Sequence, residues 1–321
     1  DNNNTIKSVA VELNVSECTV KYYCKKYDIC PSGFFNKSAG EVELSNFLSN
    51  QFSVETSNRK LIYPYELDSF MPKENFAIEF CGLYWHSNFG GKDKNYHYEK
   101  YKLCKDRGIR LITLYEDEWN LKKELVKCKL LHILGKTEKA KIYARNCKIV
   151  SLQPNIASDF YEQYHIQGSG IGSINIALIH NNDIVAVMLF KKRSDKQFEL
   201  TRYATSEMVV GGFEKLLSKF KKDYIWESIV TFADLRWHDG GVYYKSGFAM
   251  DKILKPDYEY IINGKRYHKF NFRHSGIKKK YPNQYDESLS EIENMDKIGI
   301  PRIYDCGKLR FVLKNEVNYG N

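Results

Sequence analysis

The sequence has no apolar stretch long enough to span a bilayer, no signal-peptide pattern at its start, and no C-x-x-C pair among its eight cysteines. A membrane-spanning helix needs about 20 apolar residues in a row, so we expect no membrane partner and a cytoplasmic location. We also expect free thiols rather than a disulfide framework or a zinc site. Cys18 and Cys24, six residues apart, would lie on different faces of a helix.

The charge balance favours a nucleic-acid partner. Lys and Arg number 49 against 40 Asp and Glu, which gives a net charge of +9. A basic surface attracts polyphosphate through counterion release, so we expect double-stranded DNA as the partner. The 321 residues are enough for about two domains of ordinary size. The composition leaves the oligomeric state open.

Two carboxylates lie in a predicted β-hairpin, one on each side of its turn. Residues 71–75 form a turn cluster between two apolar runs. In a hairpin that is symmetric about the bond between Lys73 and Glu74, Asp68 and Glu79 lie directly opposite each other, with Cβ atoms about 5 Å apart. Two negative charges at that distance need a neutralising partner, which predicts a Mg²⁺ or Mn²⁺ site. The alternative is a hairpin with two solvated carboxylates on its polar face.

A histidine follows the second strand. His86 could take a proton from water near neutral pH and act as a general base beside a metal. His97 and Lys100 share one face of a helix predicted at about residues 94–106, and they could hold a phosphate group. The alternative for His86 is an ordinary packed histidine. The alternative for His97 and Lys100 is a basic helix face.

These residues resemble a known group of enzymes. Asp68, the segment Gly-Leu-Tyr-Trp-His at 82–86 and the strand Gly-Ile-Arg-Leu-Ile at 108–112 look like the very-short-patch repair endonucleases and their phage relatives, the EDxHD homing endonucleases. The resemblance covers about residues 38–119. It implies a restriction-endonuclease-like core of the PD-(D/E)XK type that hydrolyses DNA in a phage-infected bacterial cell.

The same resemblance implies an acidic residue on a preceding helix. Glu41 fits this role and equally fits a capping box with Ser38 as the N-cap, and Glu43 is a nearby substitute. Cys81 stands where the common pattern has a lysine. The family's last acid has three candidates, which are Asp93, Glu99 and Asp117.

The N-terminal residues predict a separate module. Two short amphipathic helices over about residues 5–29, joined by a turn at Asn14, resemble a helix-turn-helix. Its second helix would present polar residues to a major groove. These residues are Ser16, Glu17, Thr19, Lys21 and Tyr22. The alternative is a helical hairpin packed on the nuclease, and residues 30–37 read as a linker.

The second half of the chain predicts a different fold. From residue 147 the expected order is a strand, a helix, three meandering strands, then helix, strand and helix. This order, with Tyr-Lys-Ser-Gly-Phe at 244–248, resembles the acyl-CoA-dependent N-acetyltransferase (GNAT) fold. Residues 233–236 and 240–243 also look like the Mom DNA-modification proteins, a branch of the same fold.

The loop that would hold the acyl-CoA pyrophosphate departs from the GNAT pattern. That pattern has a basic or amide residue and spaced glycines before a helix N-terminus, where backbone N–H groups bind phosphate. Here Met208 takes the first position, and only the adjacent Gly211 and Gly212 remain. The sequence alone therefore predicts a degenerate acyl-CoA site on a retained scaffold.

Cations alternate with aromatic residues between residues 265 and 281. Cations that follow a phosphate backbone and rings that stack on bases are typical of a nucleic-acid contact. The basic residues are Lys265, Arg266, Lys269, Arg273, Lys278, Lys279 and Lys280. The alternative is an edge strand on which lysines prevent aggregation.

The sequence therefore predicts an α/β (α+β) protein with a small helix-turn-helix at 1–30, a restriction-endonuclease-like core at 38–134 and a GNAT-like mixed-sheet domain at 145–321. The predicted function is a Mg²⁺-dependent DNA endonuclease of the homing type. Its predicted catalytic and metal-binding residues are Asp68, Glu79, His86, Glu41, His97 and Lys100. A DNA-modifying acyltransferase and a non-catalytic DNA-binding regulator are the alternatives.

Overall fold

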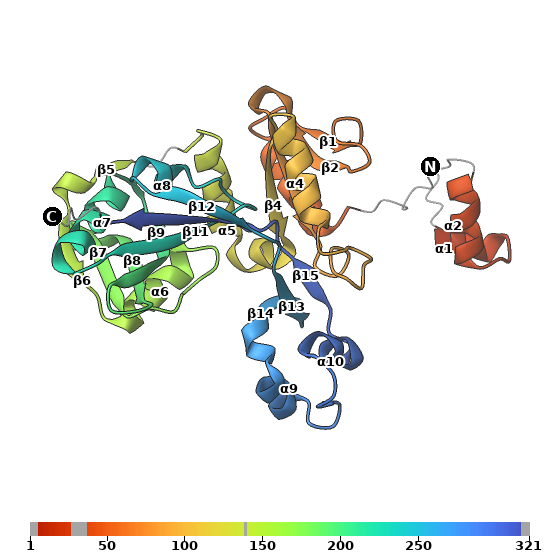
Figure 1. The fold of residues 1–321 in the computed structure, drawn as a ribbon. Coiled ribbons are helices and arrows are strands. Elements are labelled where there is room, and N and C mark those ends of the chain that lie inside the picture. Colours follow the sequence, from red (N-terminus) through yellow and green to blue (C-terminus); the bar gives the residue numbers. More distant parts are fainter. Residues whose placement is uncertain (1–5, 27–36, 138–139, 316–321) are drawn as a thin grey trace. The chain divides into compact units, whose positions relative to one another are not determined.

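The computed structural model describes residues 6–26, 37–137 and 140–315. The chain divides into two compact units, Asp1–Gln51 and Phe52–Asn321, and each is described by itself (Figure 1). Residues 30–36 of the predicted linker lie outside the described residues. Within the described ranges, no helix combines the length and the apolar character needed to cross a membrane.

The described part of the first unit contains three helices, α1 (Ile6–Glu12), α2 (Glu17–Lys26) and α3 (Ala39–Ser49). Asn14, in the turn between α1 and α2, has a positive φ of 51°, as the sequence predicted for this position. Ala10, Val20 and Cys24 are buried together where the first two helices meet. Ser38 caps α3 by accepting a hydrogen bond from the Glu41 N–H.

The second unit begins with a four-stranded sheet in the order β1-β2-β3-β4. Its strands are β1 (Glu55–Asn58), β2 (Leu67–Met71), β3 (Phe76–Cys81) and β4 (Arg110–Tyr115). The predicted hairpin is the β2–β3 pair, joined by the 3-10 turn η1 (Pro72–Glu74) and by Asn75 at φ 46°. Its register pairs Ser69 with Ile78, so the next position places Asp68 opposite Glu79.

Helix α4 (Tyr96–Asp106) connects β3 to the parallel strand β4. This crossover is needed because parallel neighbours cannot be joined by a tight turn. Helix α5 (Glu116–Ile133) follows β4 directly and carries a kink at Lys122. The helix predicted at about residues 94–106 corresponds to α4.

The second half of the chain forms a seven-stranded sheet in the order β12-β16-β11-β9-β8-β7-β6. Its strands are β6 (Lys148–Ser151), β7 (Ile174–His180), β8 (Asp183–Lys192), β9 (Gln197–Thr205), β11 (Ser228–Asp234), β12 (Ala249–Leu254) and β16 (Lys308–Lys314). Only β9 and β11 are parallel neighbours, because helix α7 (Gly212–Asp223) lies between them in sequence. The sheet is therefore mixed, as the sequence predicted for this half of the chain.

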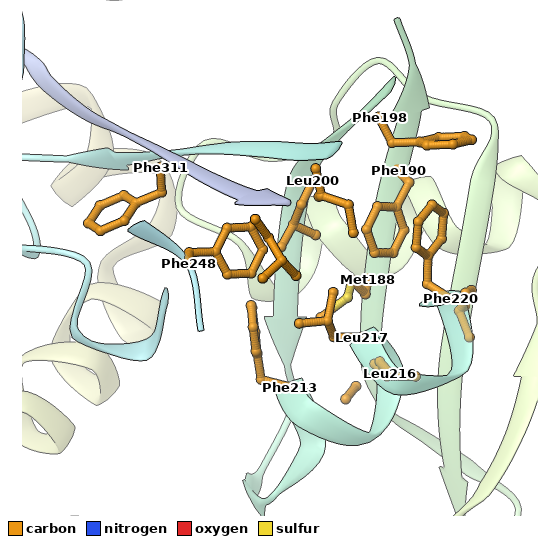
Figure 2. Close-up of a cluster of buried hydrophobic side chains, with 14 of the residues drawn as sticks. Met188, Phe190, Phe198, Leu200, Phe213, Leu216, Leu217, Phe220, Phe248 and Phe311 are labelled. Atoms are coloured by element: carbon orange, nitrogen blue, oxygen red, sulfur yellow. The ribbon is translucent and has the colours of Figure 1, made fainter. Parts of the chain in front are cut away.

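The two faces of this sheet pack on different helices. Phe213, Leu216 and Phe220 of α7 join one buried cluster with side chains of the central strands, and Figure 2 shows their rings and methyl groups interleaved with Phe190 and Leu200. Helix α6 (Pro154–Tyr164) covers the other face through a second cluster. Each large apolar side chain buried in this way contributes about 1.5–3 kcal/mol, so both faces stabilise the sheet.

Shorter elements complete this part. A two-stranded sheet pairs β5 (Lys141–Tyr143) with β10 (Met208–Val210) in parallel, immediately before α7. The 3-10 turn η2 (Ala144–Asn146) follows β5, and helix α8 (Gly241–Lys245) follows β11.

A segment of about 50 residues is inserted between β12 and β16, which are neighbours in the large sheet. It forms the small sheet β14-β13-β15 from β13 (Tyr258–Ile262), β14 (Lys265–His268) and β15 (Arg302–Tyr304). It also contains η3 (Lys269–Phe272), α9 (His274–Lys280) and α10 (Glu291–Ile298) around a core of its own. The sequence did not predict this insertion as a separate element of the GNAT-like domain.

Candidate functional site

The two carboxylates of the hairpin meet a lysine from α4. Glu79 and Lys100 are each 2% exposed and form a buried ion pair. The Phe80 N–H donates to Asp68 Oδ2 at 2.8 Å. Burial and the neighbouring charge of Glu79 raise the pKa of Asp68 well above its usual range. Asp68 and Glu79 are therefore brought together as predicted, although their charge is balanced by a side chain.

Lys100 has a different role from the one that the sequence predicted. Burial alone would lower the pKa of Lys100, but the charges of Glu79 and Asp68 outweigh burial and raise it, so its side chain stays charged. A buried ammonium group engaged with Glu79 is not placed to hold a phosphate at the surface. Lys100 is the counter-ion of Glu79.

A second cluster lies beside the first. His97, on α4, is 2% exposed, and its Nε2 lies 3.1 Å from His86 Nδ1 and 3.6 Å from Cys81 Sγ. His97 Nδ1 lies 2.7 Å from the backbone oxygen of Tyr304. Burial lowers the pKa of His97 to about 3 and that of His86 well below its usual range. Both rings are therefore neutral at pH 7.

The predicted acidic candidates have partners elsewhere. Glu41 lies in the first unit, where its carboxylate is 3.7 Å from Lys37. Asp93 Oδ1 accepts from the Asn95 N–H, which leads into α4. Glu99 accepts a hydrogen bond from the Tyr65 hydroxyl. Within the second unit, none of these contacts draws Asp93 or Glu99 toward Asp68.

Asp117 belongs to a buried network of ion pairs. Arg266, on β14, is paired with Asp117 at 2.8 Å and with Glu118 at 3.0 Å. Arg236, which follows β11, is paired with Glu118 at 3.0 Å and with Asp234 at 2.9 Å. The network therefore ties the insertion and the large sheet to the first turn of α5.

This network corrects part of the predicted DNA contact. Arg266 is only 11% exposed at its side chain and is fully engaged with acids, so it is a structural cation. Lys269 is partly buried and paired with Asp257 at 2.6 Å. The remaining predicted residues are exposed, and these are Lys265, Arg273, Lys278, Lys279 and Lys280.

The predicted reading helix is partly described. Ser16 is the N-cap of α2, since its Oγ accepts from the Thr19 N–H at 3.1 Å. The Thr19 hydroxyl lies 2.9 Å from the same oxygen, so neither side chain is free to reach a base edge without breaking the cap. Tyr22 is 62% exposed. The side chain of Lys21 lies outside the described residues.

The large sheet opens between its two parallel strands. The ladder between β9 and β11 covers three residue pairs, from Ser228–Gln197 to Val230–Glu199, although β9 has nine residues and β11 has seven. A register shift in the β8–β9 ladder lies just beyond this point and bends β9 away. Thr231 Oγ1 donates to the Leu200 carbonyl at 2.9 Å, so a side chain takes the place of the next backbone bond.

Polar groups lie where β9 and β11 separate, on the side of the sheet that α6 covers. Arg202 Nε donates to the Gly168 carbonyl at 3.0 Å, and Gln167 Nε2 donates to Asp234 Oδ2 at 3.3 Å. The loop after α6 is therefore tied to both diverging strands. Burial, followed by the charge of Arg202, lowers the pKa of His165 well below its usual range. A neutral imidazole thus lies near this opening.

A surface pocket of about 340 Å³ lies at the N-terminus of α7. It is lined by Tyr143, Ala144, Arg145, Val210, Gly211 and Lys215. Gly211 has a φ of 75°, and no side chain caps the first N–H groups of α7. A helix N-terminus with free N–H groups favours an anion, and two cations stand beside this one.

Sequence reasoning missed Arg145 and Lys215. Both lie outside residues 208–213, the segment that corresponds to the phosphate-binding loop of the GNAT pattern. The β5–β10 pairing brings the segment around Arg145 to the start of α7. Lys215 donates to the carbonyls of Ala144 and Cys147, each at 2.7 Å, and so fixes the segment that follows β5. Near this loop, the sequence signal for the pocket is Lys215, a basic residue one turn into the predicted helix.

No family model matches the sequence, and no curated protein matches it. Solved structures do. A GNAT family acetyltransferase from Elizabethkingia anophelis with bound acetyl-CoA is 13% identical, with 53% of this chain and 99% of that chain covered at a TM-score of 0.31. The ribosomal-protein-S18-alanine N-acetyltransferase from Escherichia coli is 14% identical, with 54% and 99% covered at a TM-score of 0.31. An IAA acetyltransferase from Bacillus cereus is 13% identical, with 53% of this chain and 99% of that chain covered at a TM-score of 0.30.

These comparisons correct the predicted enzyme class. The three solved structures are named as acetyltransferases, and none of the three is a phosphodiester hydrolase. The prediction of a Mg²⁺-dependent phosphodiester hydrolase, and with it the description as a homing endonuclease, is wrong. The comparisons give no support to the very-short-patch or EDxHD resemblance, to a restriction-endonuclease core or to the helix-turn-helix.

Proposed function

We propose that the GNAT-like part of this chain is an acyl-CoA-dependent acyltransferase and that its acceptor is an amino group of double-stranded DNA. The observation that carries the proposal is the divergence of β9 from β11 after three ladder pairs. Parallel strands that separate expose backbone N–H and C=O groups, which an extended amide-containing chain can pair with. The pantetheine arm of coenzyme A is such a chain.

The pocket at the start of α7 supports the same proposal. Coenzyme A carries a pyrophosphate, and the α7 N-terminus with Arg145 and Lys215 offers N–H groups and positive charge to it. In this proposal, Arg145 from the segment after β5 and Lys215 on α7 itself supply the positive charge that Met208 and the adjacent glycines lack. Glu214, in the first turn of α7, accepts a hydrogen bond from Ser246 Oγ, which engages its carboxylate.

The transfer itself needs few protein groups. The acceptor nitrogen attacks the thioester carbonyl carbon, a C–N bond forms and the C–S bond breaks. The departing thiolate takes a proton from its donor, and the proton that the acceptor nitrogen loses replaces it, so no net proton is gained or lost. Burial raises the pKa of Tyr243 despite a hydrogen bond with Thr231, so its phenol stays protonated at neutral pH. We assign Tyr243 as a candidate proton donor, because Thr231 marks the point where the strands separate.

The basic character of the chain supports DNA as the acceptor. The net charge is +9, and Lys278, Lys279 and Lys280 are exposed on α9. Such a surface would hold a duplex through its phosphates while the transfer site acts on a base.

Incubation of the full-length protein with radiolabelled acetyl-CoA and duplex DNA tests this function. We expect label in the DNA, and mass spectrometry of the released nucleosides should show an acylated base. Calorimetry with acetyl-CoA tests the binding of the acyl donor separately from its transfer to DNA. Arg145→Gln should weaken binding about tenfold or more, as expected for one lost charge-assisted hydrogen bond.

Lys219→Gln is the matched control, because Lys219 lies on the same helix and is paired with Asp223 at its far end. This variant should bind acetyl-CoA as the wild type does. If the wild-type protein binds duplex DNA but shows no heat of binding with acetyl-CoA, the acyltransferase proposal fails and the non-catalytic DNA-binding alternative takes its place.

A further inference from the structure

Cys81, His86 and His97 bring three metal-ligand atoms together, within 4.8 Å of one another. Cys81 ends β3, His86 follows in the next turn, and His97 lies in the first turn of α4. Among the residues that the structure describes, this is the group whose side chains could share one ion. It lies outside the pocket at α7 and plays no part in the acyl transfer proposed above.

The spacing of the ligand atoms suits a tetrahedral metal. With Zn–S near 2.3 Å and Zn–N near 2.0–2.1 Å, tetrahedral geometry separates S from N by about 3.6 Å and N from N by about 3.3 Å. The observed separations are 3.6 Å between Cys81 Sγ and His97 Nε2 and 3.1 Å between His97 Nε2 and His86 Nδ1. Two of the three separations are therefore close to tetrahedral values, and the third lies within 4.8 Å.

A backbone carbonyl orients the central ligand. The Tyr304 oxygen lies 2.7 Å from His97 Nδ1, so His97 carries its proton on Nδ1 and leaves the lone pair of Nε2 facing Cys81 and His86. Metal-bound histidines usually donate their other ring N–H to such an acceptor. Tyr304 comes from β15, so the insertion supports the ligand set.

We propose that Cys81, His86 and His97 bind one divalent transition metal ion of the zinc class. Two of the ligands, Cys81 and His97, are buried, whereas His86 is partly exposed, so the fourth position faces the side of His86 and is filled by water. This revises the expectation that none of the cysteines binds zinc. Carboxylate pairs bind Mg²⁺, but thiolate and imidazole ligands select zinc and cobalt.

Metal analysis of the full-length protein tests the site. The protein is stripped with a chelator, reloaded with Zn²⁺ and desalted, and zinc is then measured by mass spectrometry. Wild-type protein should retain about one zinc per chain. Loading with Co²⁺ instead should give the intense visible absorption of tetrahedral cobalt with a thiolate ligand.

Loss of a hydrogen-bond partner behind a metal ligand weakens metal binding by about 10- to 100-fold. Cys81→Ser and His86→Ala remove a ligand itself, so each should weaken zinc binding by more than that. Cys104→Ser is the control, because Cys104 is a fully buried free thiol on α4, the helix of His97, and is not part of the cluster. It should retain zinc and the cobalt spectrum.

His86→Ala changes a partly exposed side chain, so it keeps the test informative if Cys81→Ser fails to fold. Wild-type protein without retained zinc would overturn the proposal. Equal zinc in His86→Ala, with an unchanged cobalt spectrum, would overturn it as well. Neither outcome bears on acetyl-CoA binding, so the two proposals fail separately.

Discussion

Arg236 donates through Nη1 to the Glu118 carboxylate at 3.0 Å, although the two residues are 118 positions apart in sequence. Both side chains are 3% exposed, and the guanidinium carbon of Arg236 lies 4.3 Å from the centre of the Tyr115 ring. The end of β11 is therefore joined to the beginning of α5 by a buried charge pair that also stacks on an aromatic ring.

Arg236→Gln should lower the free energy of unfolding by about 3–5 kcal/mol. Removing one partner of a buried pair leaves an uncompensated charge, here on Asp234, whereas Glu118 keeps only its pair with Arg266. Urea denaturation followed by circular dichroism measures the loss. Arg193→Gln is the control, since Arg193 forms an exposed pair with Glu199 at 3.8 Å and should cost at most about 1 kcal/mol. Equal losses in the two variants would contradict the burial argument.

Gly240→Ala should destabilise the large sheet far more than Gly264→Ala. Both glycines have positive φ, 83° and 70°, so any side chain costs about 1–2 kcal/mol at either position. A Cβ at position 240 would also overlap the ring of Phe311, whereas one at position 264 meets nothing within 4 Å. We expect a further loss of about 1–3 kcal/mol for Gly240→Ala. Thermal unfolding of the two variants side by side gives the comparison, and similar melting temperatures would refute it.

His238 should make stability depend on pH below neutrality. Burial, followed by the charge of Lys129, lowers the pKa of His238 to about 4 in the folded protein. The unfolded chain, with a pKa near 6.5, binds a proton that the folded chain does not between about pH 4 and 6.5. This contribution to stability is therefore present above about pH 6.5 and is lost as the pH falls toward 4.

The variant His238→Gln tests that assignment. Its free energy of unfolding should fall less steeply over this window, by at most about 1.4 kcal/mol per pH unit. Lys129, Asp234, Asp239 and Arg110 also face the imidazole and are unchanged in the variant. Parallel pH profiles of wild type and variant would show that His238 does not titrate as described.

The elements that sequence could predict are those set by local patterns. The hairpin register follows from the turn centred on the bond between Lys73 and Glu74, because residues at equal distances from that point lie opposite each other. The strand and helix order of the second half follows from hydrophobic periodicity and from the turn at Asn181 and Asn182, both with positive φ. Each of these signals lies within a few residues of the structure that it determines.

The parts that could not be predicted depend on docking between distant segments. Nothing near Lys100 indicates that α4 will place it against Glu79, and nothing near Arg266 shows that its partners lie on α5. The sequence therefore predicts both residues as cations that bind phosphate. The same limitation hid Arg145, which reaches the start of α7 only through the β5–β10 pairing.

The exposed lysines of α9 give a prediction about DNA binding. Each phosphate that a protein neutralises changes the slope of log K against log salt concentration by about 0.9. Replacing Lys278, Lys279 and Lys280 together by Gln should therefore make the slope shallower by up to about 2.7, with an affinity loss that is similar for all sequences. Filter binding across a range of salt concentrations, with duplexes of unrelated sequence, measures both quantities.

The control must remove the same charge elsewhere. Lys191, Lys192 and Lys196 lie on or beside the β8–β9 hairpin and are exposed, so their replacement by Gln lowers the net charge equally. If α9 contacts the duplex directly, the α9 variant changes the slope and the hairpin variant changes it little, because exposed charges farther than about 10 Å from the phosphates are screened at 0.1 M salt. Equal changes in the two variants would mean that only the net charge matters, and α9 would then not be the surface that holds DNA.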